Sequence, residues 1–107
     1  MKHPTLDDVE RLRPMLSGKW KLVILYHLID GAIRWSALTE KLPQAAPNVL
    51  TRQLRQLERD GLIRRTVVAA HPPQVVEYSL TERGAALIPL LQQLAQWDAR
   101  FRLGIAG

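Results

Sequence analysis

The spacing of apolar residues along the chain predicts five helices. Apolar positions recur every three or four residues, which is the period of a helix with one buried face. The expected helices span residues 7–16, 19–29, 37–42, 47–60 and 82–102. Because proline disrupts a helix interior, we expect a bend or an early stop at Pro14 and a kink at Pro89.

Residues with known end preferences stand at the boundaries of these helices. Ser36 is expected to cap the third helix and Thr81 the last, because their hydroxyl groups accept from free backbone N–H groups. Pro47 suits the first position of the fourth helix, and Gly61 suits the left-handed residue just past its end. These end signals therefore agree with the apolar periodicity.

Beyond the fourth helix the apolar period changes from that of a helix to that of a strand. Residues 62–69 are rich in Val and Ile, and residues 76–80 alternate apolar and polar side chains. Between them, residues 70–74 include two prolines, which a central strand does not tolerate. The pattern predicts a two-stranded hairpin with a protruding tip, and a very short extended segment at residues 32–35.

The order of these elements predicts the fold. Two short helices that meet at a tight turn and are followed by a β-hairpin form a winged helix-turn-helix. We therefore expect one domain over residues 1–107, mainly α with a small β-hairpin wing. The helix-turn-helix is expected at residues 36–61 and the wing at residues 62–80.

Composition narrows the function classes. The chain has 107 residues and no cysteine, which excludes disulfides, thiolate metal sites and cysteine nucleophiles within it. Its longest uninterrupted apolar run, residues 22–26, is too short for a membrane span, and the first residues lack a signal-like segment, so a cytoplasmic location is expected. Residues 41–65 contribute +4 of the net charge of +5, which favours a polyanionic partner.

The fourth helix separates apolar and polar side chains onto opposite faces. At the angular spacing of an α-helix, Leu50, Leu54 and Leu57 fall on one face. The opposite face carries Asn48, Arg52, Arg55 and Arg59, with Thr51 at its edge. A solvated surface helix would also show this pattern, but the helix-turn-helix context and the local charge favour nucleic-acid binding.

These side chains suit the major groove of DNA. Arginine can bind a guanine edge through two hydrogen bonds, asparagine can do the same with adenine, and a threonine methyl can contact the thymine methyl. Recognition helices contact bases mainly through their N-terminal residues. We therefore assign Asn48, Thr51 and Arg52 to base edges, and Arg55 and Arg59 chiefly to phosphates.

Further contacts to the DNA backbone are expected outside this helix. Lys19 and Ser36 stand at expected helix starts, where they could bind phosphates. His71 at the hairpin tip has two interpretations, a minor-groove or phosphate contact and an ordinary exposed turn residue.

Several motifs together resemble the HxlR-type winged helix regulators, a MarR-like family. They lie at residues 18–25 (GKWKLVIL), 34–38 (RWSAL), 49–63 (VLTRQLRQLERDGLI) and 72–81 (PPQVVEYSLT). The likeness covers roughly residues 7–100, which is nearly the whole chain.

The resemblance implies a homodimeric bacterial transcription factor that binds double-stranded DNA at an inverted repeat. In that family the first and last helices, here residues 7–17 and 81–103, pair across a two-fold axis. The last helix also carries more Leu and Trp than a monomer of this size needs, which favours an interface. The candidate interface residues are Val9, Leu12, Leu16, Leu87, Leu90, Leu91, Leu94, Trp97 and Phe101.

The sequence departs from the family pattern at two positions. Many relatives carry a cysteine for thiol-based sensing where this chain has Asp7, so that mechanism is excluded here. The wing usually reads Pro-Pro-Arg, whereas the third residue here is Gln74, which still counts among the expected DNA contacts. Losing this cation weakens the expected minor-groove contact of the wing.

An enzyme is disfavoured because the three histidines are scattered and no nucleophile or phosphate-loop motif is present; no metal or cofactor is expected. A winged helix that contacts RNA or only protein remains the alternative. Trp20, His27 and Trp97, helped by Tyr26 and Trp35, could line a pocket for a small-molecule effector, or could simply fill the core.

Overall fold

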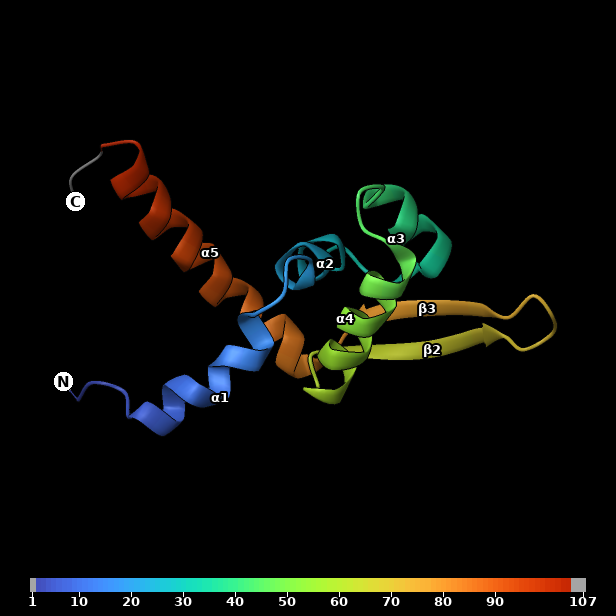
Figure 1. Ribbon diagram of the computed structural model, residues 1–107, viewed down its shortest axis with the longest axis horizontal. Coiled ribbons are helices and arrows are strands. Elements are labelled where there is room, and N and C mark those ends of the chain that lie inside the picture. Colours follow the sequence, from blue (N-terminus) through green and yellow to red (C-terminus); the bar gives the residue numbers. More distant parts are fainter. Residues whose placement is uncertain (1, 105–107) are drawn as a thin grey trace.

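A computed structural model describes residues 2–104 as five helices and three strands. The elements are α1 (Leu6–Leu16), α2 (Lys21–His27), β1 (Ile33–Arg34), α3 (Trp35–Lys41), α4 (Pro47–Arg59), β2 (Ile63–Ala69), β3 (Val75–Leu80) and α5 (Glu82–Arg102). Figure 1 shows α2, α3 and α4 gathered at the centre, with the hairpin β2–β3 extending to one side. The N-terminal part of α1 and the C-terminal part of α5 extend to the other side. The predicted winged helix-turn-helix is confirmed.

The core lies between the central helices and one face of the sheet. Its fully buried side chains include Ile24 and Leu25 of α2, Leu38 of α3 and the predicted leucine face of α4. On the sheet, Ile63 and Tyr78 close this core. Burying apolar faces of separate elements against one another is what holds such a small domain together.

The sheet has three strands, one more than the predicted hairpin. The strand order is β1-β3-β2, and all pairs are antiparallel. β1 joins β3 through the pairs Ile33↔Tyr78 and Arg34↔Glu77. The short extended segment predicted before the third helix is thus confirmed, but a two-residue strand is too short to reveal its partner through periodicity.

Several predicted helix boundaries move by one or two residues. The second helix begins at Lys21 and ends at His27, so Lys19 and Ile29 both lie outside it. Ser36 is not the cap of α3: Arg34 occupies that position with extended backbone, and Ser36 is inside the helix. The aromatic Trp35 opens α3 instead because it packs partly buried against the core.

The two terminal helices have side-chain caps. Thr5 and Asp8 form a capping box at the start of α1, which then continues through Pro14 to Leu16, so the predicted early stop is wrong. Asp8 accepts a hydrogen bond from the Thr5 backbone N–H, which lowers the pKa of its carboxyl group. Thr81 caps α5 as predicted, accepting from the Gly84 N–H at 3.0 Å, and α5 continues through Pro89.

The end of α4 is fastened to the start of α5, and we call this contact the α4–α5 junction. The backbone N–H of Thr81 donates to the Leu62 carbonyl at 3.1 Å, and its hydroxyl donates to the Gly61 carbonyl. The guanidinium of Arg83 donates to the Asp60 carbonyl. Three successive carbonyls after α4 are therefore satisfied by α5, and this fixes one helix relative to the other.

Close packing at the junction depends on two glycines. Gly61 has a φ of +76°, which places the chain in the left-handed region as it leaves α4, as the sequence predicted. Gly84 lies very close to the backbone of Leu62, the residue before β2. A Cβ atom at Gly84 would lie 2.0 Å from the Leu62 carbonyl oxygen. Only glycine fits this second position.

Candidate nucleic-acid interface

The structure brings the predicted base-contacting residues together on α4. Asn48, Thr51, Arg52 and Arg55 line one shallow hollow of about 480 Å³ together with Pro47. The polar residues belong to the N-terminal part of the helix, from its first turn to its third, and their face lies opposite the buried leucines. Because Pro47 occupies the first turn, it removes a donor that would otherwise be free there.

Arg59 extends this polar face toward the end of the helix. Its side chain is exposed, as are those of Arg52 and Arg55. Among residues 2–104 the ion pairs are Arg13–Glu10 and Arg102–Asp98, which lie on α1 and α5. The arginines of α4 are thus not neutralised by a carboxylate within the described part of the chain, which suits them to an external anion.

A buried glutamine fixes the orientation of α4. The side-chain oxygen of Gln53 accepts a hydrogen bond from the Trp20 backbone N–H at 2.9 Å, at the start of α2. Gly18, with a φ of +99°, allows the chain to pass within contact distance of this amide. Sequence reasoning missed Gln53, although its place beside Leu57 at the edge of the apolar face was a usable signal.

A buried lysine joins α1 to the central helices. The ammonium group of Lys21 donates to the Pro14 carbonyl near the end of α1. Burial lowers the pKa of Lys21, an effect that Asp60 partly offsets and Arg59 strengthens. Sequence analysis assigned no role to Lys21, because a lysine within an apolar stripe more often extends to solvent.

The predicted phosphate contacts lie on the surface, at separate elements. Lys19 is exposed before α2, and its ammonium group lies 5.1 Å from the centre of the Trp20 ring. Ser36 is exposed in the first turn of α3. His71 and Gln74 are exposed in the loop between β2 and β3. Their contacts with DNA stay predictions.

The apolar side chains predicted for an interface line the outer helices. Leu90, Leu94, Trp97 and Phe101 of α5 are more than half exposed, with Leu94 at 53% and Trp97 at 59%. On α1, Val9, Leu12 and Leu16 are also exposed, and no residue of this helix is buried. Leu87 and Leu91 are partly buried because they also pack against the core.

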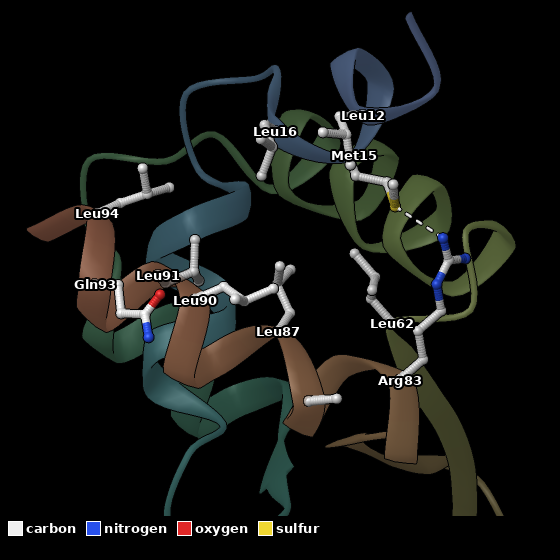
Figure 2. A pocket seen from close by; sticks show the side chains of 11 residues that line it. Leu12, Met15, Leu16, Leu62, Arg83, Leu87, Leu90, Leu91, Gln93 and Leu94 are labelled. Carbon is white, nitrogen blue, oxygen red and sulfur yellow. Dashed lines mark hydrogen bonds between the residues drawn. The ribbon is translucent and has the colours of Figure 1, made fainter. Parts of the chain in front are cut away.

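Two apolar grooves follow α5 on different sides. The first, about 550 Å³, lies between α1 and α5, and Figure 2 shows leucines from both helices pointing into it. Arg83 stands at its edge, where its guanidinium donates to the Met15 sulfur at 3.3 Å. The second, about 840 Å³, lies between α2 and α5. Its lining includes Leu22, Tyr26, Ile29, Leu94 and Trp97.

The expected effector pocket is not formed by the three residues predicted for it. Trp97 lines the α2–α5 groove, which Tyr26 also lines but Trp20 and His27 do not. Trp20 packs partly buried against the core, and His27 faces a separate hollow next to Asp30. Spacing along the chain does not specify how one helix is rotated relative to another, so it overestimated the proximity of Trp97 to Trp20 and His27.

The fold and the polar face of α4 together define a winged helix-turn-helix protein. Its sequence matches the model of the HxlR-like helix-turn-helix family over residues 15–103. The chain belongs to this family. No helix within residues 2–104 combines the length and the apolar character that crossing a membrane would require.

Individual relatives agree with this assignment. The HTH-type transcriptional regulator YdeP of Bacillus subtilis (strain 168) is 44% identical over 94 residues, which cover 88% of this chain and 73% of the relative. The redox regulator HypR in its reduced form is 40% identical with a TM-score of 0.78, covering 89% of this chain and 93% of that chain.

A third relative extends the structural likeness to almost the whole chain. A transcriptional regulator of the MarR family from Enterococcus faecalis V583 gives a TM-score of 0.82 at 33% identity. The match covers 97% of this chain and 94% of that one. The arrangement of helices and wing described here is therefore shared by solved structures of regulators.

Proposed function

We propose that the protein is a transcriptional regulator that binds double-stranded DNA as a homodimer at an inverted repeat. The observation that carries this proposal is the hollow on α4, where Asn48, Thr51, Arg52 and Arg55 meet. A helix can enter the major groove only with such a polar face exposed and its other face buried, as α4 has. Membership of the HxlR-like family supports it, as does the similarity to HTH-type transcriptional regulators such as YdeP.

Each side chain of the hollow has a role in this proposal. Arg52 binds a guanine edge, Asn48 binds adenine, and the Thr51 methyl contacts thymine. Arg55 and Arg59 lie further along the helix and bind phosphates, which fixes the position of α4 on the duplex. Lys19, which precedes α2, and Ser36, in the first turn of α3, add contacts to the DNA backbone.

In this proposal three parts of the single domain have different tasks. Residues 36–61 form the helix-turn-helix, residues 62–80 form the wing, and the helices at residues 7–17 and 81–103 form the dimer interface. The grooves on both sides of α5 support the interface, because an apolar surface of this extent is rarely left uncovered. A second copy of the same chain covers it symmetrically in the proposed dimer.

Selection from randomised duplex DNA at near-physiological salt tests the function, with the molecular mass in solution measured alongside. We expect an enriched inverted repeat whose half-sites are about 10–10.5 base pairs apart, or a multiple of that spacing, together with the mass of a dimer. Binding without enrichment, or binding only to RNA, would contradict sequence-specific recognition of duplex DNA by this protein.

Arg52→Ala is expected to weaken binding to the selected sequence by about 1–3 kcal/mol and to relax base preference at one position per half-site. The reason is that a base contact made through two hydrogen bonds is lost while the phosphate contacts remain. Repeating the selection with the variant and titrating the variant with single-base variants of the site measure both effects. Unchanged affinity and preference would remove Arg52 from the interface.

Arg59→Ala is expected to weaken binding to all duplexes alike and to reduce the slope of log affinity against log salt concentration by about one. A phosphate contact releases counterions but carries no base preference, which distinguishes it from Arg52. Fluorescence titrations at several salt concentrations measure the slope. Arg100→Ala on α5 removes the same charge far from the polar face of α4 and is expected to leave the slope unchanged.

A further inference from the structure

The C-terminal ends of α1 and α4 lie close together. α1 ends at Leu16 and α4 at Arg59, and a single side chain, that of Arg83, contacts residues at both ends. The last carbonyls of an α-helix have no partner within the helix, and this end carries a partial negative charge. Two such ends side by side therefore need hydrogen-bond donors and positive charge from other elements.

A buried lysine and an exposed arginine supply both, and we call this pair the cation bridge. Lys21, at the start of α2, donates from its ammonium group to the Pro14 carbonyl of α1, and the charge of Asp60 at the end of α4 stabilises its charged form. Arg83 of α5 donates from Nη1 to the Asp60 carbonyl and from Nη2 to the Met15 sulfur of α1 at 3.3 Å, a contact shown in Figure 2. Each cation thus interacts with both helix ends.

α1 has few other contacts with the body of the protein. Of its eleven residues, all within the described part of the chain, none is buried and only Met15 is partly buried against the core. Its N-terminal part projects away from the body in Figure 1. A helix of this length is about 16 Å long, so a rotation of about 15° at the held end displaces the other end by about 4 Å. The cation bridge therefore has a large influence on the direction of α1.

α5 depends less on the cation bridge than α1 does. At the α4–α5 junction, Thr81 donates to the carbonyls of Gly61 and Leu62, and neither hydrogen bond involves Lys21 or Arg83. Removing the cation bridge is therefore expected to loosen α1 while α5 stays attached to the end of α4.

We propose that Lys21 and Arg83 are positioning residues, which fix the angle between α1 and α4 and thereby the spacing of the half-sites that the dimer accepts. In the proposed dimer α1 packs against the second copy and α4 enters the DNA, so the cation bridge connects the two binding surfaces. A rigid connection permits one separation of the two recognition helices, whereas a loose connection permits several. This inference rests on the proposed function and adds to it the residues that determine operator spacing.

A set of duplexes tests the inference: the selected inverted repeat, the same half-sites one base pair closer or further apart, and a single half-site. One base pair moves the second half-site by about 3.4 Å along the duplex axis and about 35° around it. A rigid dimer cannot follow this movement without deforming itself or the DNA. The unaltered protein is expected to bind the selected spacing about tenfold or more tightly than the altered spacings, within the usual range of coupling between two sites.

Lys21→Met and Arg83→Met remove the two charges and keep unbranched side chains. Each variant is expected to reduce the spacing discrimination to about threefold or less. Affinity for the single half-site is expected to stay unchanged, because the polar face of α4 is intact. In Lys21→Met the Ser17 hydroxyl still donates to the Pro14 carbonyl, at 3.4 Å, so this carbonyl keeps a partner and the variant is expected to fold.

Arg13→Met provides the matched control in the last turn of α1. Arg13 is exposed, and its guanidinium pairs with Glu10 of the same helix rather than with α2 or α4. This variant is expected to keep the full spacing discrimination. Arg83→Lys retains a cation near the Asp60 carbonyl and is expected to keep part of it. Melting temperatures and molecular masses of all variants check that each is a folded dimer.

Three results would overturn the inference. Full spacing discrimination in the variant with both substitutions would mean that other contacts set the angle of α1. Equal losses of affinity for the single half-site and the inverted repeat would indicate general loosening of the fold. A monomeric variant would mean that the cation bridge holds the dimer together instead of setting its geometry. The proposed function fails separately, if the unaltered protein does not distinguish the selected half-sites from scrambled ones.

Discussion

Replacing Gly84 with alanine will destabilise the folded protein by about 3 kcal/mol, at the upper end of the cost of overpacking. The added Cβ would lie 2.0 Å from the Leu62 carbonyl oxygen, which is a backbone atom and cannot move aside independently. α5 must therefore shift away from the strand, and the hydrogen bond from Thr81 to Leu62 is strained or lost. Urea denaturation followed by circular dichroism measures the change in the free energy of unfolding.

The sign of this effect distinguishes the contact from helix propensity. On an exposed helix, exchanging glycine for alanine stabilises by roughly 0.5–1 kcal/mol. Ala85→Gly, at the next and exposed residue of α5, is the reference for propensity alone and is expected to destabilise by about 1 kcal/mol. A stable Gly84→Ala variant would show that α5 does not approach Leu62 as closely as described.

Leu94→Asp is expected to convert the proposed dimer into a monomer and to lower affinity for the full inverted repeat by about a hundredfold or more. Leu94 lines both grooves along α5, so a charge there is unfavourable whichever groove the second copy covers. The second half-site is then no longer bound at the high effective concentration that a linked partner provides. Analytical ultracentrifugation and titration of full and half sites measure the two effects.

Gln96→Asp controls for the added charge, two residues further along α5. Gln96 is exposed and lines neither of the two grooves. This variant is expected to remain dimeric and to bind the full site almost as well as the unaltered protein. A dimeric Leu94→Asp variant, or a monomeric protein before any substitution, would contradict an interface through α1 and α5.

The elements with a clear signal in the sequence are those whose side chains alternate between buried and exposed faces over several turns. The leucine face of α4, the hairpin and the Thr81 cap are all predicted and found. β1 was expected only as a short extended segment, because its pairing with β3 depends on residues more than forty positions away. Local preference predicts Ser36 as a cap, but it does not include the packing that holds Trp35 against the core and starts α3 one residue earlier.

The residues of the candidate site also fall into those that the sequence predicts and those that it does not. The polar face of α4 follows from helix geometry alone, since all its residues belong to one element. Gln53 and Lys21 were missed because their roles come from contacts between elements. The residues expected to line an effector pocket are separated for the same reason: Trp97 lies on α5 and Trp20 precedes α2, and only the packed structure defines how these two helices are rotated relative to each other.

The α4–α5 junction has a consequence for how regulators of this design diverge. Because α4 is fastened to α5, the separation of the two recognition helices in the proposed dimer is determined by how the two α5 helices cross. Base preference, in contrast, depends on the exposed side chains of α4. Mutations can therefore change which bases are bound without changing the spacing of the half-sites, and the two properties of an operator can evolve independently.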